Sequence, residues 1–157
     1  MQADRQEKDN MNTDCITIRM EDIDIGKLCG AAEDIAFDVT GEKLNMDSDC
    51  LMILDRVVEC FSELKYAMIA GGDEELLYLV AAAVGIYTGE YMLRHSLARK
   101  GFRWMIVDNE PGIFDSDGAL GLYPVSRVYD MIINDAPGAL FPLQEYYGSF
   151  SRFMQAS

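Results

Sequence analysis

Apolar residues recur at helical spacing through the first half of the chain. In residues 24–40 they return every three or four positions, and Gly41 follows as a typical C-terminal stop. A second stripe can be capped by Asp47 or Ser48 and ends at Gly71-Gly72. Together the two patterns predict two amphipathic helices. The inward positions of the second are Leu51, Leu54, Val57, Val58, Phe61, Leu64 and Met68.

A longer and more uniformly apolar helix is predicted over residues 73–100. Asp73 can cap it, and Gly101 follows its basic last turn as a stop. The short glycine loop before it makes the two helices an antiparallel hairpin. Its longest uncharged run, Leu76 to Gly89, has 14 residues, fewer than the roughly 20 of a membrane span, which indicates a buried core helix. Small residues give it a thin face for a close neighbour: Ala81, Ala82, Ala83, Gly85 and Gly89.

Strand-like alternation of apolar and polar residues occurs in two places. Residues 15–20 alternate and predict a short strand. Residues 102–107 alternate as well, and we expect residues 119–123 to be their antiparallel partner across a loop over residues 108–118. The apolar period therefore changes twice along the chain, which favours a mixed fold.

The C-terminal part predicts two further helices. Pro124 suits a first helical position and opens a short helix. Residues 134–138 break it, and a final helix follows with Leu140, Leu143, Tyr147, Phe150 and Met154 inward. The sum is an α+β fold, a helical body with a small antiparallel sheet at one edge. Residues 1–13 are predicted to be a disordered tail, and residues 14–157 a single domain.

Charge is distributed unevenly along the chain. The 157 residues carry 27 Asp and Glu against 13 Lys and Arg, a net charge of −14. Residues 1–75 hold 19 of the carboxylates and only 7 of the basic residues. Such a field repels nucleic acid and anionic membranes and attracts basic proteins. We therefore expect a protein partner, and neither a nucleic acid nor a membrane.

Candidate catalytic groups are sparse. His95 is the only histidine, and no serine or cysteine lies in a motif that would pair with it as a nucleophile. An enzyme would require a deep pocket that holds His95 and Glu90 within hydrogen-bond reach. The basic residues around His95 are predicted instead to pair with the acidic half of the chain: Arg94, Arg99, Lys100 and Arg103. We therefore predict no enzyme, no catalytic residue and no cofactor.

Metal-binding patterns are also weak. The four cysteines have none of the close spacings typical of zinc sites, so we expect reduced, buried thiols and a cytoplasmic protein, for which no signal peptide is apparent. Two interpretations stay open for the loop carboxylates. They can gather around a hard cation, or they can form a solvated turn with Gly118 at positive φ. These carboxylates are Asp108, Glu110, Asp115 and Asp117.

Several motifs resemble a family of small uncharacterised bacterial domains over about residues 25–150. The resemblance lies in the segments Gly41-Glu-Lys-Leu-Asn-Met-Asp-Ser, Leu51 with Leu54-Asp55, Gly85-Ile-Tyr-Thr-Gly-Glu90, Gly101 with Trp104, and Leu122-Tyr-Pro-Val-Ser-Arg-Val128 with Tyr129. Members of this family are similar to immunity proteins of polymorphic and contact-dependent toxin systems. The chain departs from the pattern at Asn45, Asp47 and Cys50, where the family has Asp, Ser and Ser. These motifs are structural, so the resemblance implies the fold first and an immunity role second.

The leading hypothesis is an acidic immunity protein that binds and neutralises a cognate basic toxin domain, such as a nuclease. A nuclease presents cationic surface to phosphates, which an acidic inhibitor can cover. The alternative is a non-enzymatic interaction or regulatory module of another kind. The predicted binding residues lie on the exposed faces of the helices before Gly71: Asp34, Asp38, Asp47, Asp49, Asp55, Glu59 and Glu63. The sequence leaves the partner's identity and the oligomeric state open.

Overall fold

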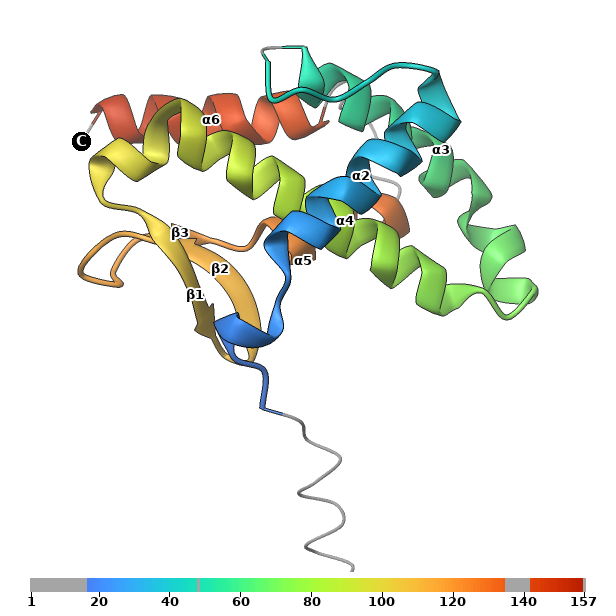
Figure 1. Cartoon of the computed structure of the whole chain (residues 1–157), viewed down its shortest axis with the longest axis horizontal. Coiled ribbons are helices and arrows are strands. Elements are labelled where there is room, and N and C mark those ends of the chain that lie inside the picture. The colour runs from blue at the N-terminus through green and yellow to red at the C-terminus, as the bar shows by residue number, and fades with distance from the viewer. Residues whose placement is uncertain (1–16, 48, 135–141, 157) are drawn as a thin grey trace, which may run out of the picture.

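The described part of the chain folds into five α-helices and a three-stranded antiparallel sheet (Figure 1). The computed structural model describes residues 17–47, 49–134 and 142–156. The predicted α+β class is confirmed, with the sheet at one edge of the helical body. The predicted tail over residues 1–13 lies outside the described residues. The helices are α2 (Ile25–Thr40), α3 (Cys50–Ala70), α4 (Glu74–Met92), α5 (Pro124–Ile133) and α6 (Pro142–Ala156), and the strands are β1 (Arg103–Val107), β2 (Glu110–Phe114) and β3 (Gly121–Leu122).

Helix α4 is the central element, and the other helices pack around it. It is buried at almost every position from Val80 to Met92. Figure 1 shows α2 crossing α4, with α3 returning beside it as the other arm of a helical hairpin. Beyond Met92 the helix continues as a π-helical turn, Leu93–Leu97, and a 3₁₀ turn, Ala98–Lys100. The predicted helix over residues 73–100 is thus confirmed, with a change of winding in its last turns.

The predicted thin face of α4 is used for close packing. A Cβ added at Gly85 would lie 2.5 Å from the Cα of Val125 at the start of α5. A Cβ at Gly89 would lie 2.4 Å from the ring of Trp104 on β1. Real Cβ atoms do not approach this closely. The two glycines therefore set how near α5 and the sheet can approach the central helix.

The sheet pairs differently from the prediction. Residues 110–114, expected to be loop, form β2, which pairs with β1 from Arg103↔Phe114 to Val107↔Glu110. Strand β3 then pairs with β2 rather than with β1. The physical reason is a two-residue turn, because Asp108 and Asn109 both have positive φ, 54° and 59°. This is the conformation that type I′ hairpin turns require.

The predicted strand at residues 15–20 is wrong over its described part. Residues 17–19 belong to no strand, and Met20–Asp22 forms a 3₁₀ turn. The Asp22 carboxylate accepts the Arg19 N–H at 3.1 Å, which favours this turn. The segment is tied to the β1–β2 hairpin by the Ile18 N–H, which donates to the Asn109 side chain at 2.7 Å.

The observed helix ends agree in part with the capping residues that the sequence predicts. Asp24 caps α2 by accepting the Lys27 N–H, and Gly41 ends that helix in the left-handed conformation with φ 76°. Asp73 precedes α4 but makes no side-chain cap bond. Helix α3 begins at Cys50, later than predicted, because the Asp47 side chain accepts the Asp49 N–H and forms a turn before the helix. The side chains of Leu140 and Met154 lie outside the described set, whereas Leu143 in α6 is fully buried.

One stretch, Glu74–Lys100, is long and apolar enough to cross a membrane. Its most apolar window is 72% buried inside the protein. The burial arises because α2, α3, α5 and the sheet all pack on it. The stretch is therefore the core helix of the fold, as its uncharged run predicted.

We predict that Gly85→Ala destabilises the protein by about 1–3 kcal/mol, because the new methyl group overlaps the α5 backbone. Gly30→Ala in α2 is the matched control, since nothing lies within 4 Å of its added Cβ. That substitution should stabilise by roughly 0.5–1 kcal/mol through helix propensity. Urea denaturation of both variants measures the difference, and equal effects would contradict the close packing.

Candidate protein-binding surface

Six of the seven predicted binding carboxylates are exposed. Asp34 and Asp38 lie on α2, and Glu59 and Glu63 lie on α3. Asp47 and Asp49 lie in the connector, which we define as residues 41–47 and 49 between these helices. The structure therefore collects four of the six at the α2 end and connector, with the other two further along α3.

Two adjoining hollows lie beside the connector and share Lys43 as a lining residue. The first has a volume of about 600 Å³ and is lined by Glu33, Asp34, Phe37, Asp38, Lys43 and Leu44. The second has a volume of about 460 Å³ and is lined by Glu42, Lys43, Asn45, Asp47, Asp49, Met52, Ile53 and Arg56. Each hollow thus combines at least three carboxylates with one or more apolar side chains.

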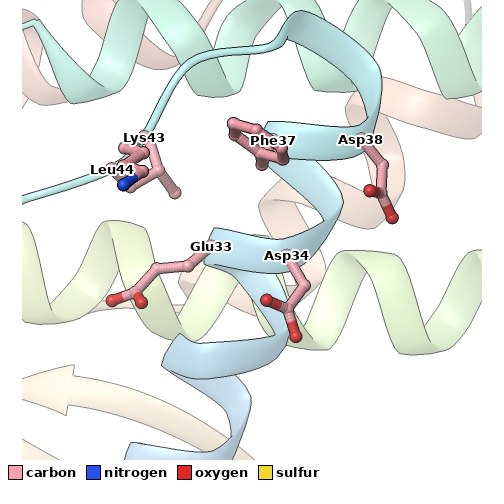
Figure 2. A pocket seen from close by; sticks show the side chains of 6 residues that line it. All are labelled: Glu33, Asp34, Phe37, Asp38, Lys43 and Leu44. Atoms are coloured by element: carbon pink, nitrogen blue, oxygen red, sulfur yellow. The ribbon is translucent and has the colours of Figure 1, made fainter.

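Figure 2 shows how the first hollow is built. Phe37 and Glu33 extend from α2 toward the connector, where Lys43 and Leu44 face them. Asp34 and Asp38 extend on the other side of the same helix. The Phe37 side chain is 51% exposed, which is high for a large apolar residue. An aromatic ring between carboxylates can contact the stem of an Arg or Lys side chain whose charged end reaches an acid.

The connector is fixed to α4 through Met46. Met46 has φ 60°, which is uncommon for a residue other than glycine. Its N–H donates to the Tyr87 hydroxyl at 2.9 Å, and its carbonyl oxygen lies 2.8 Å from Nε2 of His95. Since a carbonyl can only accept, His95 is the donor. The histidine therefore fixes the backbone that carries the hollows.

The exposed carboxylates are not neutralised by the basic residues of the second half. Within the described ranges, the ion pairs join Arg19 to Glu21 and Asp22, and Arg56 to Glu42. The prediction that the cluster from Arg94 to Arg103 pairs with the acidic half is wrong for these ranges. His95 bonds Met46 in the connector, so the end of this helical stretch lies beside the acidic surface, but Arg99 donates instead to the His95 carbonyl oxygen at 2.7 Å. Arg56 pairs with Glu42 at the second hollow, and the described surface around the two hollows stays net negative.

Asp55 is the exception among the predicted binding residues, because it is buried with 3% of its surface exposed. Its two carboxylate oxygens accept the N–H groups of Leu143 at 2.7 Å and Gln144 at 3.4 Å, at the start of α6. Its prediction as an exposed binding residue is wrong. Burial raises the pKa of the Asp55 carboxyl to about 6, and the two N–H donors hold that rise back. Asp55 ties α6 to α3.

Lys65 is a second buried charged residue of α3, and the sequence did not single it out. It is 1% exposed, and its Nζ donates to the Ile133 carbonyl oxygen at 2.8 Å, at the last residue of α5. Lysine at a helix C-terminus satisfies a carbonyl that has no partner within the helix. Asp55 and Lys65 therefore link α3 to the start of α6 and the end of α5.

Neither hollow contains the pair of residues that the enzyme hypothesis requires. His95 and Glu90 line neither of them. Among the described residues, no three His, Cys, Asp or Glu side chains come together in a way that could hold a metal ion. Asp115 and Gly118 form the turn of one alternative, because Asp115 accepts the Ala119 and Leu120 N–H groups and Gly118 has φ 70°.

Comparison of the chain with protein-family models, with curated proteins and with solved structures gave no match. The geometry of the surface therefore carries the functional argument.

Four lining residues of the first hollow were missed by the sequence reasoning: Glu33, Phe37, Lys43 and Leu44. Phe37 had a usable signal, because it is a large apolar residue outside the inward stripe of its helix. Lys43 and Leu44 had none, since the path of the connector depends on contacts with α4.

We predict that the free energy of unfolding falls by about 1 kcal/mol between pH 5 and 7.5 through Asp55 alone. Its pKa in the folded state, about 6, lies above the usual carboxyl value. As pH rises, the native state therefore keeps the proton to a higher pH than the unfolded chain does. Stability from this group is present at low pH and is lost as pH rises through about 6. Asp55→Asn should remove this dependence, and Asp55→Ala should be less stable than Asp55→Asn at every pH.

Denaturant titrations at several pH values measure the effect. Asp34→Asn on α2 is the control and should keep the wild-type pH dependence, because Asp34 is exposed. An Asp55→Asn protein with an unchanged pH profile would contradict the assignment.

Proposed function

We propose that this chain is a non-enzymatic protein-binding module that recognises a cationic protein through α2, the connector and the exposed face of α3. In its specific form the proposal is an acidic immunity protein that neutralises a cognate basic toxin domain, such as a nuclease, by covering its active surface. The observation that carries it is the net negative surface beside two hollows.

Electrostatics explains why such a surface suits a cationic partner. Complementary fields raise the rate of encounter by roughly 10–1,000-fold at low salt and suppress the binding of like-charged proteins. Lys43 lines both hollows and Arg56 lines the second, which leaves three carboxylates against one cation in the first hollow and three against two in the second. The net charge of the surface is therefore negative at both hollows.

The immunity form of the proposal is based on the cationic active surface of a nuclease. Its active surface carries Lys and Arg that contact phosphates, and these cations are available to an acidic protein that arrives first. An inhibitor of this kind needs shape and charge rather than catalytic groups. The hollows supply both, with Phe37 as an apolar contact among the carboxylates.

A cytoplasmic location forms part of the proposal, and the thiols support it. Cys29, Cys50 and Cys60 are free. Burial raises the pKa of the Cys29 thiol to about 11 and that of Cys50 to about 12. These thiols stay protonated at neutral pH and react slowly, as expected of structural cysteines in a reducing compartment.

The toxin candidate is the basic C-terminal domain of a secreted protein encoded next to this chain's gene. Co-expression of the chain with that domain should restore bacterial growth. A triple variant, Asp34→Lys with Asp38→Lys and Asp49→Lys, should lose protection and slow association by tenfold or more, because it reverses the charge at the hollows. Plating assays and stopped-flow binding measure the two effects.

The matched control reverses three exposed carboxylates elsewhere: Asp117, Asp130 and Glu145. Both triple variants change the net charge by the same amount, so a difference between them reports position. Equal protection by the two folded variants would remove the proposed surface. Failure of the wild type to protect against any neighbouring basic domain would remove the immunity form.

A further inference from the structure

Exposed apolar side chains concentrate at one end of the α3–α4 hairpin. The hairpin tip, which we define as residues 64–79, includes the last turns of α3, the Gly71-Gly72 turn and the first turns of α4. Its large apolar side chains are 42–69% exposed: Leu64, Tyr66, Ile69, Leu76, Tyr78 and Leu79. Elsewhere in the described residues only Phe37, Val39 and Met52 are comparably exposed. Single exposed apolar residues are ordinary, but such a concentration marks an interaction surface.

The first turns of α4 are unlike the rest of that helix. From Val80 onward the neighbouring elements bury α4, whereas Leu76 and Leu79 are 45% and 50% exposed. These two residues stand three apart, so they share one side of the helix. On another side Tyr78 stacks on Tyr129 of α5, with ring centroids 4.3 Å apart. The tip is therefore held in place from within and presents its leucines outward.

Carboxylates surround these side chains. Glu63 precedes the tip on α3, and Asp73, Glu74 and Glu75 lie at its turn, all of them exposed. The lysine of the tip, Lys65, is buried and bonded to Ile133. An apolar centre with a charged rim is the usual anatomy of a protein interface. Within residues 63–79, all of them described, every exposed charged side chain is negative.

We propose that the hairpin tip is the anchoring contact for the cationic partner, and that it takes an apolar helix or ridge flanked by Lys and Arg. This inference rests on the proposed function for the partner's charge and adds a second contact area. The carboxylates beside the hollows govern the rate of encounter, and the leucines of the tip govern how long the complex lasts.

Charge distinguishes this occupant from the others that could cover an apolar surface. A second copy packed through the same face would bring two sets of rim carboxylates together. Residues 1–16 of the chain are also acidic, with four carboxylates against two basic residues. An anionic bilayer would be repelled as well. A basic protein segment satisfies both the apolar centre and the rim.

The test uses two synthetic amphipathic helical peptides with the same leucine stripe, one flanked by lysines and the other by glutamates. Fluorescence anisotropy should show binding of the lysine peptide and none of the glutamate peptide. Leu76→Ser with Leu79→Ser should weaken binding roughly tenfold or more, through lost apolar contact. Leu79→Ser alone is the milder variant, and circular dichroism checks that both fold.

Phe37→Ser with Met52→Ser is the matched control, because it removes two similarly exposed apolar side chains at the hollows. We expect that control to bind the lysine peptide within about twofold of the wild type, since it leaves the tip intact. If the control loses binding while the Leu76 and Leu79 variant keeps it, the proposed anchoring role of the hairpin tip is disproved. The proposed function is unaffected by that result.

Three further outcomes would overturn the inference. They are equal binding of both peptides, a dimer in sedimentation equilibrium that the leucine variant dissociates, and leucine-dependent binding to phosphatidylcholine vesicles. Absence of wild-type binding to the lysine peptide would overturn it as well, while the growth assay tests the proposed function independently.

Discussion

The close packing of α4 at Gly85 and Gly89 is the constraint on which the rest of the structure depends. At these two positions the helix is thin enough for the α5 backbone and the Trp104 ring to reach it directly. The same helix is buried on nearly every side from Val80 to Met92, which a largely apolar composition allows. One helix therefore supplies the core for three helices and the sheet, and the carboxylates are left for the outside.

The binding surface depends on the same helix through polar contacts. Tyr87 of α4 and His95 of the π-helical turn that continues it satisfy both backbone groups of Met46, which holds a left-handed conformation between α2 and α3. A connector fixed in this way loses less conformational entropy when a partner binds. The acidic side chains beside it then present a fixed pattern of charge. The hollows and the core thus belong to one arrangement, in which α4 positions a surface that it does not itself form.

The sequence predicted the helices well because their signals are local. Apolar periodicity, Gly41 and Pro124 are sufficient to place α2 and α5, and the small residues of α4 indicated a close neighbour. The sequence did not identify that neighbour, because the contacts with Val125 and Trp104 join distant parts of the chain. Strand β2 was missed because Pro111 and Gly112 weaken a strand pattern, although Asp108-Asn109 is a recognisable hairpin turn.

Burial of charged residues was harder to predict than secondary structure. Asp55 lies among apolar neighbours on α3, with Leu51 four residues before it and Val58 three residues after it, which was a local sign of burial. Its hydrogen-bond donors come from α6, far away in the sequence, as does the Ile133 carbonyl that accepts from Lys65. Met46 gave no sign, because methionine has no preference for positive φ. In each case a distant segment supplies the hydrogen-bond partner that stabilises the buried charge or the positive φ.

The central claim is that the acidic α2–connector–α3 side of the molecule receives a cationic protein. Amide chemical-shift mapping by NMR tests it most directly, with unlabelled basic toxin domain added to the ¹⁵N-labelled chain. The account predicts the largest shifts in residues 33–47 and 64–79, with β1 to β3 little changed. Shifts concentrated in the sheet or around Arg99 to Arg103 would contradict it.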